Sequence, residues 1–567
     1  MIQAKVRGLI WDQWELYSKN HPEREAIIHW DILAEPVRWT YGGLIKEALK
    51  VADQLIKQGI NTGDVCAIII RHNKYFYPIY AGISAIGAIP AVLAYPNPRL
   101  HPDKFKEGLA GMAKLSGLDW ILTERDLEPI IKPLVIAEKS TIKGMFFPLE
   151  FDYSLEGDID TAEIKRRRSS VKKTDPFLLQ HSSGTTGLQK AVVLSHKSVL
   201  DHVREYSGSI DLSQNDKVIN WLPLYHDMGL IAAFHMPLIT GIPSIQIDPF
   251  QWVLDPSILF QAITREKATL TWLPNFSYNF MVDRIPEENM KDIDLSNIRM
   301  FVNCSEVVRP ESHDKFFNRF QNYGVKKESL AACYAMAETT FAVTQTKPGT
   351  VVKTVAVDRN SLSNKIVIPA KSGDNVKVCM SSGETIKGCS IKITDAQGNL
   401  LPEGRIGKIV ISSTSLFDGY RNNPEKTKKA LKDGWYHSGD IGFVYEGEYF
   451  IIGREDDVII AAGRNIYPED IEDTVNKVKG IIPGRVIAFG VEDIETGTQD
   501  IHVVAETIYD KEEEKEKLKL EIKQAGMSVD VTISIVHLVP QRWLIKSSSG
   551  KPSRKSNRER ILSQSEY

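Results

Sequence analysis

The chain has 567 residues, too many for one hydrophobic core and equivalent to about four domains on length alone. Its 70 basic and 73 acidic side chains leave a formal net charge of -3, so no overall field favours nucleic acid. Five cysteines without CxxC spacing argue against a disulfide framework or a zinc ribbon and fit a reducing, cytoplasmic environment.

Neither a signal peptide nor a membrane span is predicted. Residues 1–20 carry charges and lack a continuous apolar stretch. Residues 77–96 are nearly uncharged and about long enough to cross a bilayer. Their small residues, with Pro78 and Pro90 in the interior, indicate instead a packed helix that runs into a buried strand. No HExxH motif or paired His/Cys cluster indicates a structural metal.

Residues 11–123 alternate helical and strand patterns. Apolar positions at helical spacing predict a helix over 41–58. Short apolar runs, rich in β-branched residues, predict buried strands at 65–70, 90–94 and 120–123. Strands separated by helices indicate βαβ units and a doubly wound parallel sheet.

Two basic segments could mark an interaction surface. Residues 165–173 fit a phosphate or partner patch, but a solvated linker is the simpler interpretation. Residues 546–555 are basic and rich in Ser and Gly. They fit either a nucleic-acid tail or a mobile loop that presents one lysine, and the pattern leaves both open.

A loop of small and hydroxyl residues between two apolar runs is the most informative stretch. Its glycines let the backbone approach a ligand, and successive N–H groups form a nest for anionic oxygens. Its hydroxyls add donors, and its lysine adds a point charge suited to phosphate. The Gly-to-Lys spacing is wrong for a P-loop, and a flexible Ser/Gly loop is the alternative. The residues are Ser182, Ser183, Gly184, Thr185, Thr186, Gly187 and Lys190.

Several later strands end in polar residues, which in an open α/β sheet share one crevice at the carboxyl ends. A strand near residue 220 leads into a turn that carries His226 and Asp227. Strands are predicted over 268–273 and 298–303, and the second runs into the turn 304–307. Glu338 follows a further apolar run. Taken singly, His226 fits a packed histidine and Glu338 an ordinary helix-start carboxylate.

From residue 351 onward, short β-like runs separated by turn residues predict a small β subdomain. Within it, Asp440 and Arg454 flank a hairpin. A carboxylate can accept hydrogen bonds from a ribose diol, and the arginine would add hydrogen-bond donors. The alternative is an ordinary surface ion pair. The predicted strands are 365–369, 375–378, 390–393 and 407–411.

The last hundred or so residues predict a compact α+β unit. A helix is expected over 464–478, with Pro468 early in it, and strands over 485–489 and 501–505. The mixed-charge run 510–523 predicts a helix with a solvated face.

In order, these motifs resemble the adenylate-forming superfamily of acyl-CoA synthetases, nonribosomal-peptide adenylation domains and luciferases. The match begins at the Ser/Thr/Gly loop and covers nearly the whole chain. It continues through 334–338, 438–440 and 453–454 to Gly550-Lys551.

Within the superfamily, three stretches look like those of fatty acyl-AMP ligases: 222–230, 334–338 and 463–472. The extended segment at about 348–378 looks like the insertion that marks these ligases. In that family the insertion hinders the domain rotation that would let coenzyme A attack.

The resemblance implies an α/β fold with two domains. Residues 1–455 would form a large N-terminal AMP-binding domain of two doubly wound sheet subdomains plus a small β subdomain. Residues 456–567 would form a small, mobile α+β C-terminal domain. Asp456 matches the superfamily's hinge position, where a few dihedrals could swing the small domain.

The resemblance also implies the chemistry. A fatty carboxylate attacks the α-phosphorus of ATP, giving an acyl-adenylate and pyrophosphate. The acyl group then passes to the phosphopantetheine thiol of an acyl carrier protein, or of a carrier domain in a polyketide or nonribosomal-peptide synthase. ATP and Mg²⁺ are the implied cofactors, and neither nucleic acid nor a membrane is an expected partner.

Site roles follow from the matched motifs. Residues 182–190 would cradle the β- and γ-phosphates, and Glu338 with Thr186 would hold Mg²⁺. Lys551 would reach the carboxylate and α-phosphate oxygens, with His226 near the carboxylate. Asp440 and Arg454 would take the ribose. The adenine would lie between the 304–307 turn and the following run: Ser305, Glu306, Tyr334, Ala335, Met336 and Ala337.

The chain departs from the family pattern at several glycines and prolines. Gln189 stands where Pro is usual, and Ala191 and Ala335 where Gly is usual. Residues 304–307, Cys-Ser-Glu-Val, stand where Gly-Ala-Glu-Pro is usual. An added methyl at Ala335 would require a different backbone or narrow the adenine slot. The alternatives are an acyl-CoA ligase and a pseudoenzyme that binds nucleotide or a carrier domain without turnover.

Overall fold

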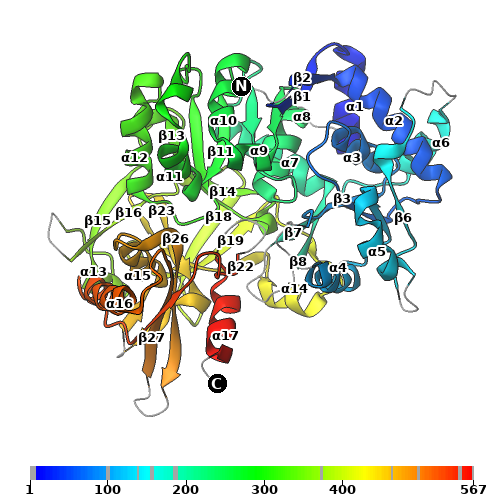
Figure 1. The fold of residues 1–567 in the computed structure, drawn as a ribbon. Coiled ribbons are helices and arrows are strands. Elements are labelled where there is room, and N and C mark those ends of the chain that lie inside the picture. Colours follow the sequence, from blue (N-terminus) through cyan, green and yellow to red (C-terminus); the bar gives the residue numbers. More distant parts are fainter. Residues whose placement is uncertain are drawn as a thin grey trace.

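The computed structural model describes residues 8–32, 34–96, 102–136, 140–153, 159–182, 190–370, 375–461, 464–493, 498–546 and 552–564. Figure 1 shows mixed helices and sheets, with the first third of the chain on one side and the orange and red C-terminal unit on the other.

The first sheet has four strands, all parallel, in the order β4-β3-β5-β6. The three strands predicted before residue 123 are therefore confirmed, as is their parallel pairing. The segment 77–96 is core, because every residue of helix α3 is buried. None of the helices in the described part of the chain combines the length and apolar character that a bilayer crossing needs. The elements are β3 (Val65–Ile69), α3 (Phe76–Ala85), β4 (Ile89–Val92), α4 (Pro102–Ser116), β5 (Trp120–Thr123), α5 (Glu128–Val135) and β6 (Gly144–Phe146).

The second sheet has nine strands in the order β17-β14-β13-β12-β11-β9-β10-β1-β2. Its centre, from β13 to β1, is parallel, and antiparallel strands close both edges. The strands are β1 (Glu25–Asp31), β2 (Ala34–Thr40), β9 (Val218–Asn220), β10 (Ser244–Ile247), β11 (Leu270–Pro274), β12 (Met300–Cys304), β13 (Leu330–Ala335), β14 (Ala342–Gln345) and β17 (Glu384–Thr385).

Helices pack against both sheets. Close packing of α2 on α3 depends on Gly82, where a Cβ would lie 2.7 Å from the Val51 side chain and 2.9 Å from the Ala48 carbonyl oxygen. The helices are α1 (Ile10–Asn20), α2 (Tyr41–Lys57), α6 (Thr161–Ser169), α7 (His196–Ser209), the π-helix η3 (Met228–His235), α8 (Met236–Thr240), α9 (Pro249–Leu254), α10 (Ser257–Glu266), α11 (Asn275–Arg284) and α12 (Pro310–Phe320).

A small β region follows. A five-stranded sheet is built on the order β18-β19-β22-β21, with β23 on β22, and β20 joins β7 and β8 in a three-stranded sheet. The elements are β7 (Pro176–Ser182), β8 (Lys190–Ser195), β15 (Thr354–Asp358), α13 (Arg359–Ser363), β16 (Val376–Met380), β18 (Cys389–Thr394), β19 (Gly407–Ser413), β20 (Gly419–Tyr420), α14 (Pro424–Ala430), β21 (Leu431–Lys432), β22 (Trp435–Tyr445) and β23 (Glu448–Arg454).

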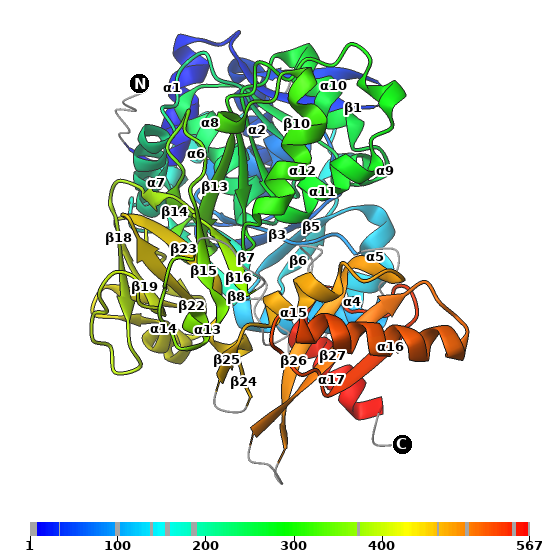
Figure 2. The same cartoon turned by 90° about the vertical axis from the view of Figure 1, so that its left-hand side faces the viewer.

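The C-terminal unit is α+β, as predicted. Figure 2 shows it beside the β15–β16 pair, and β26, β27 and β28 form its sheet. Its elements are the 3-10 turn η8 (Glu455–Asp457), β24 (Ile459–Ala461), β25 (Arg464–Ile466), α15 (Pro468–Val475), β26 (Ile481–Asp493), β27 (Thr498–Thr507), α16 (Glu512–Met527), β28 (Ile535–Val539) and α17 (Arg554–Gln564).

Two predicted elements are wrong. Residues 365–369 form isolated bridges rather than a strand, with Lys365 at a φ of 60° that breaks the extended backbone. The predicted helix 464–478 is only α15, because residues 464–466 pair with β24 as a hairpin. Pro468 then starts the helix at its first position, where its missing N–H costs nothing.

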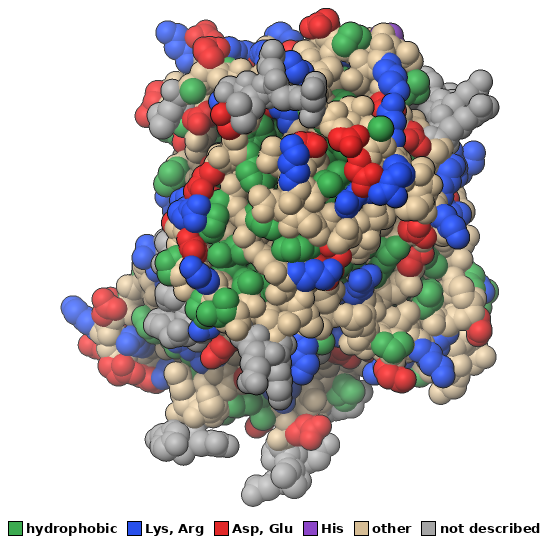
Figure 3. All heavy atoms as spheres, turned by 90° about the vertical axis from the view of Figure 1, so that its right-hand side faces the viewer, with side chains coloured by type: hydrophobic (Ala, Val, Ile, Leu, Met, Phe, Trp, Pro, Cys, Tyr) green, Lys and Arg blue, Asp and Glu red, His purple; other side chains and the backbone are tan. Residues whose placement is uncertain are grey.

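The basic run 165–173 is not a linker. It contributes most of helix α6, in which Arg166 and Arg167 both pair with Glu163. Arg168 turns inward, lies 5.1 Å from the Trp11 ring and donates to the Ala85 carbonyl oxygen at 3.1 Å. On the face that Figure 3 shows, basic and acidic side chains are interspersed. The three arginines of the run are therefore paired or buried.

We expect Arg168→Ala to lower the midpoint of thermal unfolding by about 2–4 °C. The variant leaves the Ala85 carbonyl buried without its charged donor, and such a bond is worth about 1.5–3 kcal/mol. Arg166→Ala is the matched control, since the Arg166 side chain is 73% exposed. Calorimetry of both variants checks this, and an equal loss in the control would contradict it.

Candidate active site

The Ser/Thr/Gly loop joins strands β7 and β8, which pair in an antiparallel hairpin with Ser182 opposite Lys190. The two apolar runs beside the loop are thus paired strands. The loop itself lies outside the described residues, so the roles of Ser183, Gly184, Thr185, Thr186 and Gly187 stay predictions. Lys190 opens β8, and its amino group lies 5.1 Å from the centre of the Tyr420 ring.

Glu338 lies in a short 3-10 turn (Ala337–Thr339) that follows β13. The residue is 6% exposed, and its Oε1 accepts a hydrogen bond from the Tyr420 hydroxyl at 2.8 Å. No Lys, Arg or His of the described part of the chain forms an ion pair with this carboxylate. Lys426 and Arg454 are close enough for their charges to interact with Glu338 but do not pair with it. A buried carboxylate without a directly bound cation is costly, so the arrangement fits a cation that arrives with a ligand.

Residues 413–421, here called the bridging segment, hold the Glu338 turn against strand β8. Phe417 donates its N–H to the Glu338 carbonyl oxygen at 2.9 Å. Asp418 and Arg421 donate theirs to two carbonyl oxygens of β8, each at 2.9 Å. Lys190 and Glu338 are thus parts of one bonded framework. The sequence interpretation missed Tyr420, whose only local signal is an aromatic residue after a glycine.

Asp440 and Arg454 face each other across the β22–β23 ladder. Arg454 Nε donates to Asp440 Oδ1 at 2.9 Å, and the Tyr334 hydroxyl donates to Oδ2 at 2.5 Å. The Asp440 side chain is 14% exposed and the Arg454 side chain 44%, so the ion pair is half-buried, and Tyr334 adds a third partner to it. Three residues predicted for the nucleoside therefore meet in one network.

Burial and the neighbouring charges both shift the pKa values of the three residues in this network. Burial raises the pKa of Asp440, and the neighbouring Arg454 acts in the opposite direction. Asp440 in turn raises the pKa of Arg454. Burial, with help from Asp440, also raises the pKa of Tyr334, so its hydroxyl stays a donor.

The predicted adenine turn and its partner run lie at neighbouring strand ends. β12 and β13 are parallel neighbours, and Ser305 and Glu306 follow the first while Ala335, Met336 and Ala337 end or follow the second. Ser305 takes a φ of 71° where the family has a small residue. Ala335 has no positive φ, so its methyl group fits an ordinary strand backbone.

His226 lies in the turn between β9 and the π-helix η3, next to the β7–β8 hairpin. Gln180 of β7 donates to the Tyr225 carbonyl oxygen at 2.7 Å, and the rings of Tyr225 and His226 meet edge to face at 4.6 Å. Gly229 is required just beyond, since a Cβ there would lie 2.5 Å from the Pro223 carbonyl oxygen. The turn is therefore held beside β7.

Lys551 lies outside the described residues, but the two ends of its loop are tied together. Ile545 donates its N–H to Asn557 Oδ1 at 2.7 Å and accepts from Asn557 Nδ2 at 2.8 Å. Lys546, at one end of the loop, is close enough to Glu306 for their charges to interact. Lys546 therefore lies near the predicted adenine turn.

The AMP-binding enzyme family matches residues 14–421 of the chain. A relative from Mycobacterium tuberculosis (strain ATCC 25618 / H37Rv), "Probable long-chain-fatty-acid--AMP ligase FadD30", is 31% identical over 550 residues, which cover 91% of each chain. The resemblance inferred from the motifs is thereby confirmed.

Solved structures agree. A chain from a study of fatty acyl-adenylate ligases from E. coli and L. pneumophila superposes with a TM-score of 0.87 at 23% identity, covering 100% of this chain and 99% of that one. A fatty acyl-adenylate ligase from L. pneumophila in complex with acyl adenylate and pyrophosphate superposes with a TM-score of 0.73 at 25% identity. The superposition covers 99% of this chain and 97% of that one. The predicted fold class is confirmed.

Proposed function

Because the chain belongs to the AMP-binding enzyme family and, within it, to the fatty acyl-AMP ligases, we propose that it activates a fatty acid with ATP and passes the acyl group to a carrier protein. The thiol acceptor would be the phosphopantetheine of an acyl carrier protein or carrier domain. The observation that carries the proposal is the bonded framework joining Lys190 to Glu338 through Tyr420. The cysteine pattern and the use of ATP fit the cytosol.

The reaction brings two anions together. A carboxylate oxygen of the fatty acid forms a bond to the α-phosphorus, and the bond to the bridging oxygen breaks as pyrophosphate leaves. Both the approach and the charge on the phosphates need cationic or N–H donors in fixed positions. Lys190, with the loop 182–187, supports the β- and γ-phosphates in this proposal. Lys551 serves the reacting oxygens, with His226 near the carboxylate.

The nucleoside would be held by the Tyr334–Asp440–Arg454 network. Asp440 is ready to accept hydrogen bonds from a ribose diol, because Arg454 and Tyr334 already orient its two oxygens. The adenine would lie between the Ser305–Glu306 turn and the 335–337 run. These two backbone stretches follow adjacent parallel strands and so share one edge of the sheet.

Mg²⁺ fits at Glu338. The described residues contain no group of three or more His, Cys, Asp or Glu side chains that could hold a metal. One buried carboxylate is enough here, because Mg²⁺ typically uses one or two carboxylates together with substrate phosphates. When bound, Mg²⁺ supplies positive charge to the phosphate oxygens. We propose Glu338 and Thr186 as its protein ligands.

Choice of a carrier thiol over coenzyme A rests on the insertion. Lys377 of β16 bonds Asp470 of α15, and Arg359 lies 3.5 Å from the same carboxylate. Asn465 also donates to the Ser363 carbonyl oxygen at 3.1 Å. We propose that these contacts hold the C-terminal unit, residues 456–567, against rotation about Asp456.

The deciding experiment is mass spectrometry of the products formed from ATP, Mg²⁺ and a panel of fatty acids, with and without coenzyme A. We expect acyl-adenylate that coenzyme A does not consume and that a phosphopantetheinylated carrier protein does. Efficient acyl-CoA formation would make the chain an acyl-CoA ligase. Absence of adenylate with every acid, together with ATP binding by calorimetry, would make it a pseudoenzyme.

We expect Lys551→Ala to slow adenylate formation at least about 100-fold, the scale seen when a donor to developing charge is removed. Its thermal midpoint should stay unchanged. Lys555→Ala is the control, since that side chain is 50% exposed and faces Glu559. Pyrophosphate release gives the rate and calorimetry the midpoint; a variant that loses stability and keeps its rate would refute the assignment.

We expect Lys377→Ala to raise acyl-CoA formation relative to carrier loading, because it removes a buried cation that joins the insertion to α15. Lys353→Ala is the control: it belongs to the same insertion but pairs with Glu448 of β23, at 3.2 Å. The product ratio is read by mass spectrometry. An unchanged ratio in Lys377→Ala would count against the insertion as the barrier.

A further inference from the structure

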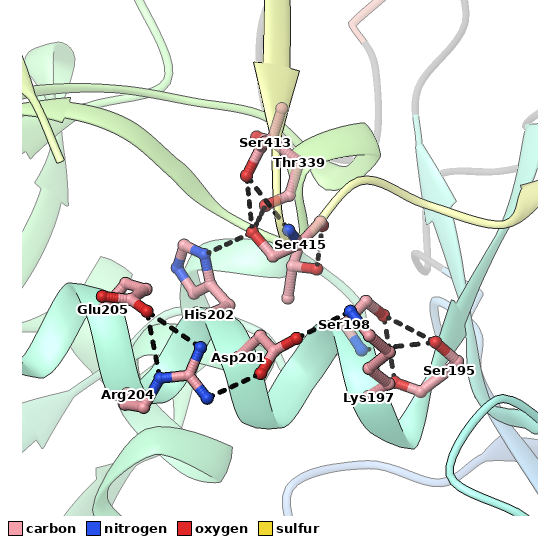
Figure 4. Close-up of polar contacts among 11 residues, drawn as sticks. Ser195, Lys197, Ser198, Asp201, His202, Arg204, Glu205, Thr339, Ser413 and Ser415 are labelled. Atoms are coloured by element: carbon pink, nitrogen blue, oxygen red, sulfur yellow. Dashed lines mark hydrogen bonds and ion pairs between the residues drawn. The ribbon is translucent and has the colours of Figure 1, made fainter. Parts of the chain in front are cut away.

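His202 lies on the inner face of helix α7, more than a hundred residues in sequence from the segments it contacts. It is 1% exposed, and its ring stacks on Tyr206 and meets Phe341 edge to face. Figure 4 shows the ring directed toward Ser415. The outer face of the same helix carries a row of ion pairs among Lys197, Asp201, Arg204 and Glu205.

Both ring nitrogens of His202 have partners. Nε2 accepts the N–H of Ala342 at 3.3 Å, so the ring proton of the neutral imidazole sits on Nδ1. Nδ1 then donates to Ser415 Oγ, also at 3.3 Å. Burial lowers the pKa of His202 to about 3, so the ring stays neutral at any pH at which the enzyme works.

Ser415 passes this connection to the turn that carries Glu338. Its hydroxyl donates to the Thr339 carbonyl oxygen at 3.3 Å, and its own carbonyl accepts from Thr340 Oγ1 at 2.8 Å. Ser413 Oγ lies 3.0 Å from Ser415 Oγ and accepts the Ser415 N–H, which fixes the hydroxyl further.

The turn needs such support because its backbone is strained. Thr340 has φ 70° and ψ −50°, a region that β-branched residues avoid. Strained conformations persist only where the surroundings determine them. Here the determining bonds come from His202 and from the bridging segment, which also binds Glu338 through Phe417 and Tyr420.

We propose that His202, acting through Ser415, is a positioning residue that holds the Glu338 carboxylate where it binds the metal of the Mg²⁺–ATP complex. This inference rests on the proposed function and adds a residue on α7 to its machinery. His202 does not touch substrate; it fixes the backbone of residues 339–342, which directly follow Glu338.

The test measures metal coupling rather than turnover. Calorimetry gives the Kd of α,β-methylene-ATP, which cannot be adenylated, with Mg²⁺ and with EDTA. For His202→Phe we expect the tightening by Mg²⁺ to fall by about tenfold, a loss of about 1.4 kcal/mol in coupling. The Kd in EDTA should change less than about twofold, since the nucleoside network is untouched.

The chain offers a matched control. His196 is also buried on α7, but its partners are the backbone N–H of Ile10 in helix α1 and the ring of Phe177 in β7. Neither partner belongs to the Glu338 turn or to the bridging segment. His196→Phe should keep the full Mg²⁺ effect. His202→Asn, which retains a donor in the place of Nδ1, should recover part of it.

Each outcome decides the matter. A His202→Phe variant that melts earlier and keeps the wild-type Mg²⁺ effect would make His202 structural only and overturn the proposal. If that variant does not fold, Ser415→Ala takes its place, and a wild-type Mg²⁺ effect there overturns it equally. Absence of any Mg²⁺ effect in the wild-type protein would instead remove the proposed role of Glu338, and this inference with it.

Discussion

Strand β20 pairs with β8, and the segment that contains it bonds Glu338 through both its carbonyl oxygen and its carboxylate. Lys190 therefore opens the same strand to which the Glu338 turn is tied. In the proposed function, this places a cation and a carboxylate on one framework for a phosphate chain and its metal. The strained turn at Thr340 is bonded to the same segment through Ser415.

A second constraint acts through the acidic helix α15, whose carboxylates form ion pairs both within the C-terminal unit and with the large domain. Glu469 and Glu472 bind Arg554, three residues beyond Lys551, and so fix the base of the lysine loop within the C-terminal unit. Asp470 and Asp473 bind Lys377 and Arg309 of the large domain. In the proposal, rotation of the unit about Asp456 would break the second set of ion pairs and leave the first intact.

Sequence patterns predicted secondary structure correctly where interactions within a short segment determine it. The apolar strands β3, β4 and β5 are recognisable because they are buried on both faces and separated by helices. The same approach failed at 365–369, where a positive φ at Lys365 ends the extended backbone, and at 464–466, where pairing with β24 overrides the helical pattern. It also treated Arg168 as solvated, although the tertiary structure buries it against Trp11.

The sequence by itself determined the fold class and the family, because ordered motifs and strand ends are properties of short stretches. It also singled out Glu338, Asp440 and Arg454, whose roles in the site stay predictions. Only the tertiary structure decided which residues support them. Tyr420 reaches Glu338 across 82 residues, and His202 reaches Ser415 across 213. No periodicity or spacing encodes such pairs, since they arise when separate sheets and a helix pack around one buried carboxylate.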